Sequence, residues 1–170
     1  MTREDVLDAT LALAEERGLD AVSMREVARR LGVTPMALYR HVGDKQGLLD
    51  GLVERLLDEL PVPDPSLPWD ERLRALGAGT REVARRHPDA FVMLLRRPAT
   101  TPASVRRRET VYAALRDAGV PEELVPRVER LISTFMLGFA ASEAGGRFAH
   151  HDTAVLDADL AWLEGLVPLT

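Results

Sequence analysis

The sequence predicts an all-α fold of about nine helices, divided into two domains at residues 1–60 and 61–170. Apolar residues recur at helical spacing through most of the chain, and no stretch shows convincing β-strand alternation. Four prolines in residues 61–68 cannot continue a helix, so we place the domain boundary there. In residues 23–45, two short helices joined by a glycine turn match the pattern of a helix-turn-helix unit.

The composition is typical of a globular protein without membrane spans. Of 170 residues, 46% are apolar and 29% are charged, and no long apolar run occurs. The absence of cysteine excludes disulfides and thiolate metal sites, and the run His150-His151-Asp152 matches no common metal-site spacing, so we predict no metal. No signal-like segment opens the chain, so we expect a cytoplasmic protein. The patterns G-x-S-x-G, HExxH and a phosphate-binding glycine loop are missing, which argues against an enzyme, and no cofactor is predicted.

The elements of the first domain follow from apolar spacing and local capping signals. A first helix is expected over residues 3–17, and a second over 24–31, where apolar residues fall at i, i+3, i+4 and i+7. Gly32 can take the left-handed conformation that closes a helix. Thr34 is expected to cap a third helix over 35–41, and the proline that follows it suits a first helical position.

The later helices are assigned in the same way. Residues 45–60 carry two apolar rows, which suit a helix that packs on both sides rather than facing water. Beyond the proline segment, helices are expected over residues 69–86, 88–95, 103–118, 121–145 and 153–166. We expect the run Arg106-Arg107-Arg108 to form a solvated helix face.

Charge is unevenly distributed along the chain. The whole chain has a net charge of −5, whereas residues 23–45 hold five cationic and two acidic side chains, a local balance of +3. An acidic protein with one basic face suggests a confined docking site for DNA. On spacing alone, two ordinary surface helices whose charges are simply solvated remain an alternative.

The run LGVTPMALYRHVGDKQGLLDGL, residues 31–52, resembles the DNA-binding domain of the tetracycline-repressor (TetR) family of bacterial transcription regulators. The pattern is carried by Leu31-Gly32-Val33, Thr34, Leu38-Tyr39, Arg40, His41-Val42, Gly43, Asp44-Lys45 and Leu48-Leu49. The resemblance covers about the first 50–57 residues, and the Tyr-x-His-Val form is nearest to the tetracycline repressors themselves.

The resemblance implies a helix-turn-helix domain joined to a ligand-binding and dimerisation domain. The expected function is that of a homodimeric repressor, which binds a palindromic operator in double-stranded DNA and leaves it when a small-molecule effector binds. An activator, or a ligand-independent DNA-binding protein of the same fold, is the alternative.

The resemblance also implies which residues contact DNA. Arg40 is the candidate for a guanine or phosphate contact, Tyr39 and His41 for phosphates, and Met36 for a thymine methyl group. Packing of Tyr39 in the core is an alternative. The full set is Ser23, Met24, Arg25, Thr34, Pro35, Met36, Tyr39, Arg40, His41 and Lys45.

A repressor of this type also needs an effector pocket and a dimer interface. The pocket candidates are His87, Phe91, Met93, Leu94, Arg97, Tyr112, Phe135, Met136, Phe139 and Glu143. Methionine and aromatic residues at helical spacing more often belong to the core than to a ligand pocket, so a core role for these residues remains an alternative. The interface candidates lie on the last two expected helices and are Leu124, Val128, Leu131, Phe135, Leu156, Leu160, Leu163 and Val167. The same apolar rows could instead form a core within one chain.

Overall fold

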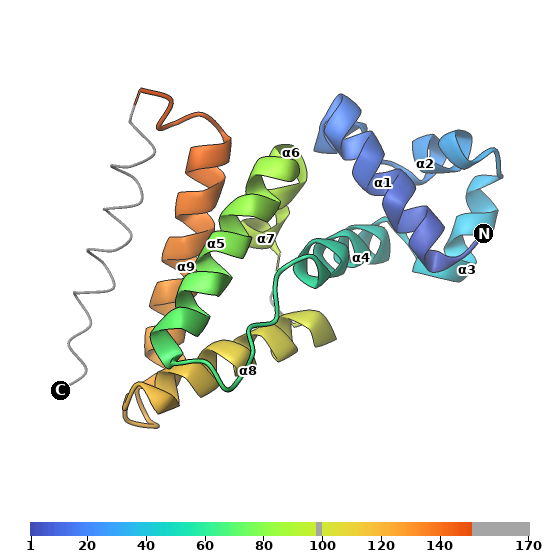
Figure 1. The fold of residues 1–170 in the computed structure, drawn as a ribbon. Coiled ribbons are helices and arrows are strands. Elements are labelled where there is room, and N and C mark those ends of the chain that lie inside the picture. Colours follow the sequence, from blue (N-terminus) through green and yellow to red (C-terminus); the bar gives the residue numbers. More distant parts are fainter. Residues whose placement is uncertain (98–99, 151–170) are drawn as a thin grey trace.

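The computed structural model describes residues 1–97 and 100–150, and within those ranges every regular element is helical, which confirms the all-α fold (Figure 1). The elements are α1 (Arg3–Arg17), a 3-10 helix (Leu19–Ala21), α2 (Met24–Leu31), α3 (Pro35–Val42), α4 (Lys45–Asp58), α5 (Trp69–Arg86), α6 (Pro88–Phe91), α7 (Met93–Arg96), α8 (Pro102–Asp117) and α9 (Val125–Ala144). We call α1–α3 the head and α5–α9 the body. Helix α4 leads from the head to the body (Figure 1).

Short polar contacts begin the helices of the head. The Thr2 hydroxyl accepts a hydrogen bond from the backbone N–H of Asp5 at 3.1 Å, and the Asp5 carboxylate accepts one from the N–H of Thr2 at 2.6 Å, which together form a capping box. The Ser23 hydroxyl caps α2 at 3.2 Å. The side-chain cap expected from Thr34 does not form; α3 begins at Pro35, whose fixed φ and missing N–H suit a first turn.

The turn between α2 and α3 depends on a left-handed residue. Gly32 has φ +66° and ψ +30°, and its N–H closes α2 by donating to the carbonyls of Ala28 and Arg29. No neighbouring atom lies within 4 Å of the place where a Cβ would stand, so only the backbone conformation restricts this position.

We therefore expect Gly32→Ala to lower the free energy of unfolding by about 1–2 kcal/mol, the cost of left-handed backbone for a residue with a Cβ. Urea unfolding followed by circular dichroism measures this change. Gly32→Asn is the matched control and should recover part of the loss, because asparagine tolerates the left-handed region better. An alanine variant as stable as the parent would contradict the prediction.

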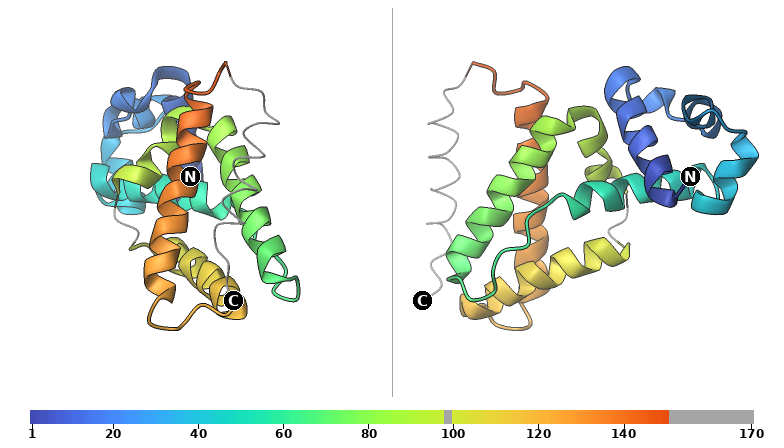
Figure 2. Two further views of the ribbon diagram at one scale, coloured as in Figure 1. Left: turned by 90° about the vertical axis from the view of Figure 1, so that its left-hand side faces the viewer. Right: turned by 45° about the vertical axis from the view of Figure 1, so that its right-hand side comes forward.

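The body is built around two long helices. Helix α5 packs along α9, and α8 packs against both helices and against α4 (Figures 1 and 2). The short helix α6 packs against α5, α1 and α4, and α7 packs against α6 and α9. Among the described residues, no helix combines the length and the apolar character that a membrane crossing requires.

Some boundaries differ from the sequence prediction. The single helix expected over residues 88–95 is the pair α6 and α7, which meet at Val92. Helix α9 begins at Val125 rather than at residue 121, because Pro126 occupies its first turn, where a missing N–H leaves no helical bond unmade. The helix expected over residues 153–166 lies outside the described residues, as do Leu156, Leu160, Leu163 and Val167.

One apolar core continues from the head into the body. Val6 of α1, Leu38 of α3, Leu52 of α4 and Phe91 of α6 are all fully buried members of it, and Ala140 of α9 completes it. A second, smaller cluster lies where α8 meets the start of α9. The division at residues 60 and 61 stays a prediction, and the larger core contains side chains from both sides of it.

Candidate nucleic-acid interface and internal cavity

The outward face of α3 carries large side chains that the core does not use. Met36 is 73% exposed and Tyr39 is 47% exposed, and Arg40 beside them is also exposed. Leu38 and Val42, on the opposite face, are buried and hold the helix to the head. The Tyr39 ring thus lies at the surface, within a shallow hollow that Thr34, Met36, Ala37 and Arg40 also line.

The five cations of residues 23–45 fall into two groups. Arg29 donates to Glu26 at 2.9 Å, and Arg30 donates through both terminal nitrogens to Glu16 at 2.6 Å. These charge-assisted bonds hold the pKa values of both carboxyls below their usual range. The hydrogen bond from Arg29 is the main cause at Glu26, and the hydrogen bonds from Arg30 are the main cause at Glu16.

The other group comprises Arg25, Arg40 and Lys45. Their side chains are exposed and make no hydrogen bond or ion pair with any part of the chain that the structure describes. Three cations therefore remain available to phosphates or base edges, where the sequence suggested five. The pairing of Arg30 with Glu16 could not be read locally, since the two residues lie 14 positions apart.

The remaining predicted DNA contacts are placed as follows. Thr34 and Pro35 are exposed at the start of α3. Ser23 is half-buried, and its hydroxyl accepts the hydrogen bond that caps α2. Met24 is half-buried and packs against the core. His41 is half-buried in the last turn of α3.

A partly open cavity of about 170 Å³ lies among α4, α5, α7, α8 and α9. Most of its lining surface is apolar, and the polar lining includes three arginines and one glutamate. The lining residues are Val53, Leu57, Leu60, Leu73, Leu76, Gly77, Thr80, Leu94, Arg97, Ser104, Arg107, Arg108, Val111, Glu129, Ile132, Ser133, Met136 and Leu137.

Only three of the pocket candidates, Leu94, Arg97 and Met136, belong to this lining. Phe91 and Met93 are buried in the larger core, and Tyr112 packs against the smaller one. The rings of Phe135 and Phe139 contact each other at a tilt, with centroids 5.8 Å apart, and Phe135 is 40% exposed. Glu143 accepts two hydrogen bonds from Arg81 at 2.7 Å, and these lower the pKa of its carboxyl.

Arg107 corrects the expectation that Arg106-Arg107-Arg108 forms one solvated face. Arg106 is exposed, but Arg107 is half-buried and lines the cavity. Its guanidinium donates to the carbonyl of Leu57 at 3.1 and 2.9 Å and also to those of Leu60 and Pro61. Arg107 therefore holds the C-terminal end of α4 to α8.

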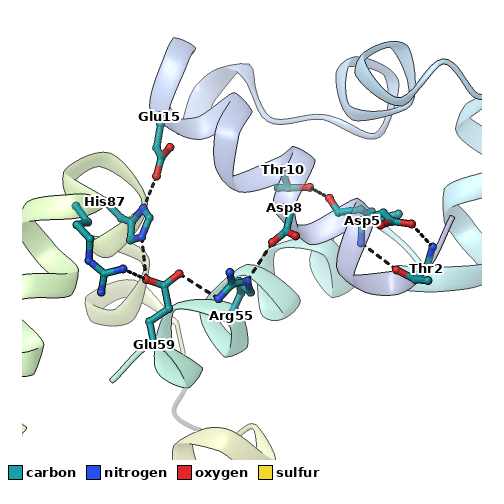
Figure 3. Close-up of polar contacts among 10 residues, drawn as sticks. Thr2, Asp5, Asp8, Thr10, Glu15, Arg55, Glu59 and His87 are labelled. Carbon is teal, nitrogen blue, oxygen red and sulfur yellow. Dashed lines mark hydrogen bonds and ion pairs between the residues drawn. The ribbon is translucent and has the colours of Figure 1, made fainter. Parts of the chain in front are cut away.

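A polar joint connects head and body on the other side of α4 (Figure 3). His87 was a pocket candidate, but its ring lies between two carboxylates, Glu15 of the head and Glu59 just after α4, with Nε2 3.0 Å from Glu59. Glu59 also accepts from Arg55 at 3.0 Å, and Arg55 donates to Asp8 of α1 at 3.1 Å. The hydrogen bond to Asp8 raises the pKa of Arg55. The joint thus fixes α1 against α4 and the body.

Comparison with known proteins gives two family matches. The family "Bacterial regulatory proteins, tetR family" matches residues 6–52, and "Tetracyclin repressor-like, C-terminal domain" matches residues 62–159. A protein of Saccharopolyspora erythraea, described as an HTH-type transcriptional regulator, is 32% identical over 162 residues, which cover 95% of this chain and 68% of that protein.

Two solved structures share the fold closely. The TetR family protein ActR of Streptomyces coelicolor, in complex with (S)-DNPA, has a TM-score of 0.76 and 30% identity, covering 88% of this chain and 75% of ActR. BioQ in complex with its natural double-stranded DNA operator has a TM-score of 0.77 and 28% identity, covering 95% of this chain and 98% of BioQ.

Proposed function

The chain belongs to the tetR family of bacterial regulatory proteins, and from this premise we propose that it is a transcriptional repressor released from its operator by a small-molecule effector. We infer a regulator rather than an enzyme, in keeping with the relative named as a transcriptional regulator. The observation that carries the proposal is the outward face of α3, with Arg25, Arg40 and Lys45 free to meet DNA.

The reading of DNA is proposed to follow from α3 lying in the major groove. Arg40 is suited to a bidentate contact with guanine, which contributes about 1–3 kcal/mol of discrimination. Tyr39 can hold a phosphate, and Met36 can meet a thymine methyl group. The complex of BioQ with its operator supports a double-stranded DNA partner.

A homodimer is proposed to form along α9. Leu131 is 64% exposed, and Phe135 and Leu124, the N-cap of α9, are also exposed. The described residues of one chain therefore leave apolar surface of this helix uncovered. A two-fold dimer places two heads on half-sites about 34–36 Å apart, and its symmetry calls for a palindromic operator.

Leu131→Asp is expected to weaken the dimer at least about tenfold, because an unpaired carboxylate buried at an apolar interface costs more than the ~1.4 kcal/mol that a factor of ten represents. Light scattering across a concentration series measures the dissociation constant. Val62→Asp, at an apolar position 76% exposed in the proline segment, is the control and should leave the dimer intact. A dimer unaffected by Leu131→Asp would move the interface away from this face.

The effector is proposed to bind in the cavity among α4, α5, α7, α8 and α9. The cavity adjoins α4, which leads to the head, so a ligand there can change how the two heads sit on DNA. The ActR complex with (S)-DNPA supports ligand binding by a protein of this fold.

Selection of bound duplexes from a random DNA pool tests the proposed binding to a palindromic operator. We expect a palindromic consensus whose half-sites are about one helical turn apart. A folded, dimeric protein that enriches no sequence would contradict the proposed DNA-binding function.

A further inference from the structure

Arg107 is a half-buried cation that lines the cavity without a bonded carboxylate. All of its hydrogen bonds within the described residues go to backbone carbonyls, those of Leu57, Leu60 and Pro61. Burial lowers the pKa of its guanidinium, and attraction from Asp58 offsets this only in part. The Asp58 carboxylate forms its ion pair with Arg106 instead, with 3.6 Å between Oδ1 of Asp58 and Nη2 of Arg106. Carbonyl dipoles are weaker partners for a guanidinium than a carboxylate is.

The rest of the cavity is suited to a small apolar group. Its volume of about 170 Å³ is close to that of an engineered cavity of ~150 Å³ that takes up benzene in another protein, and it is below the ~300–1,000 Å³ of sites for drug-sized ligands. Aliphatic side chains such as Leu73, Leu76 and Ile132 form half of the lining residues. The cavity therefore has room for a ligand with one ring or a short chain.

The other ionic groups of the lining are engaged in different ways. Arg97 donates to Asp50 of α4 through Nε at 2.9 Å and again through Nη2, so its charge is matched. Glu129 accepts a hydrogen bond from the Ser133 hydroxyl at 2.9 Å. Arg108 also lines the cavity and has an interaction partner of its own. Arg107, whose hydrogen bonds all go to backbone carbonyls, is therefore the lining cation best placed to bind an incoming anion.

We propose that the effector is a small apolar carboxylic acid, bound as its carboxylate to Arg107 with its ring or short chain in the aliphatic cavity. This inference rests on the proposed function, since it names the ligand of that same cavity. A carboxylate binds the guanidinium fork through two charge-assisted hydrogen bonds and so competes with the α4 carbonyls for it. Acid binding then loosens the C-terminal end of α4 and couples the cavity to the head.

Direct binding of matched probes tests the recognition step. Benzoate, phenylacetate and hexanoate are each compared with the corresponding amide by calorimetry and thermal shift on the full chain. Benzylamine is added because Glu129 would favour a cation. We expect at least one acid to bind about tenfold or more tightly than its amide. Acids that bind no better than their amides, or benzylamine binding more tightly than benzoate, would overturn the proposal.

Variants of the arginine run assign the effect to one side chain. Arg107→Gln should remove the preference for acid over amide, whereas Arg106→Gln, at the exposed neighbour, should keep it. Arg107→Lys retains the charge without the two-pronged geometry and should give an intermediate preference for acid over amide. This variant still tests the assignment if the glutamine variant folds poorly. A preference for acid over amide that is undiminished in a folded Arg107→Gln or Arg107→Lys variant would overturn the assignment.

Operator release separates this inference from the proposed function. Fluorescence anisotropy with the selected operator should show that the preferred acid lowers DNA affinity and that Arg107→Lys blunts this response. Release by amides with no preference for acids would overturn the inference while the repressor function stands. A protein that binds no operator would overturn the proposed function, and the acid–amide comparison would still decide the recognition by Arg107.

Discussion

Arg40→Ala is expected to weaken operator binding at least about tenfold while leaving the protein folded and dimeric. Arg40 is exposed on α3 and makes no hydrogen bond or ion pair within residues 1–97 and 100–150, so its removal takes nothing from the fold. A bidentate guanine contact contributes ~1–3 kcal/mol at each half-site, and a dimer would lose it twice. Fluorescence anisotropy at matched salt measures the loss, because salt alone changes DNA affinity strongly.

Arg29→Ala is the matched control for Arg40→Ala. Arg29 lies in the same helix-turn-helix unit, but its guanidinium is bonded to Glu26. Its removal should therefore weaken operator binding much less than removal of Arg40. Equal losses for the two variants would mean that only the overall charge of the head matters, and an unchanged affinity for Arg40→Ala would remove α3 from the reading of DNA.

Phe91→Ala is expected to lower the free energy of unfolding by about 3–5 kcal/mol, the range for removing a buried phenylalanine side chain. Phe91 is fully buried in the larger core, on a helix that contacts α1, α4 and α9. A void there would lose packing on several sides at once. Urea unfolding monitored by circular dichroism gives the change, and the slope with denaturant checks that unfolding stays cooperative.

Leu95→Ala provides the comparison for Phe91→Ala. Leu95 is a neighbour on α7 but is 44% exposed, so its truncation should change the free energy of unfolding by well under that of Phe91→Ala. A stable Phe91→Ala variant that fails to respond to effector would favour the sequence interpretation, in which Phe91 faces the ligand.

The head was predictable because its signals are local. The bounds of α1 and α2 follow from apolar spacing within a few turns and, for α2, from Gly32, and the structure has them as predicted. The outward residues of α3 were predictable for the same reason, because they follow from the local helical register in which Leu38 faces inward, and Leu38 is buried.

The cavity and the joint were harder to predict because their partners are distant in sequence. His87 meets Glu15 and Glu59 across 72 and 28 positions, and no local pattern encodes such a pairing. The prediction that Arg106-Arg107-Arg108 forms one solvated face was wrong for a different reason. Consecutive residues of a helix point about 100° apart, so Arg106 faces water while Arg107 turns inward to the α4 carbonyls.

The unbroken core between head and body limits how such chains can be recombined. A chimera cut at the proline segment would set the α1 and α4 side chains of one regulator against the α6 side chains of another. Close-packed interfaces tolerate few changes of volume, so Phe91 and its neighbours on α1 and α4 must change together. Exchange of DNA specificity by grafting is therefore expected to succeed when only the outward face of α3 is transplanted, and to fail when the whole head is moved without α6.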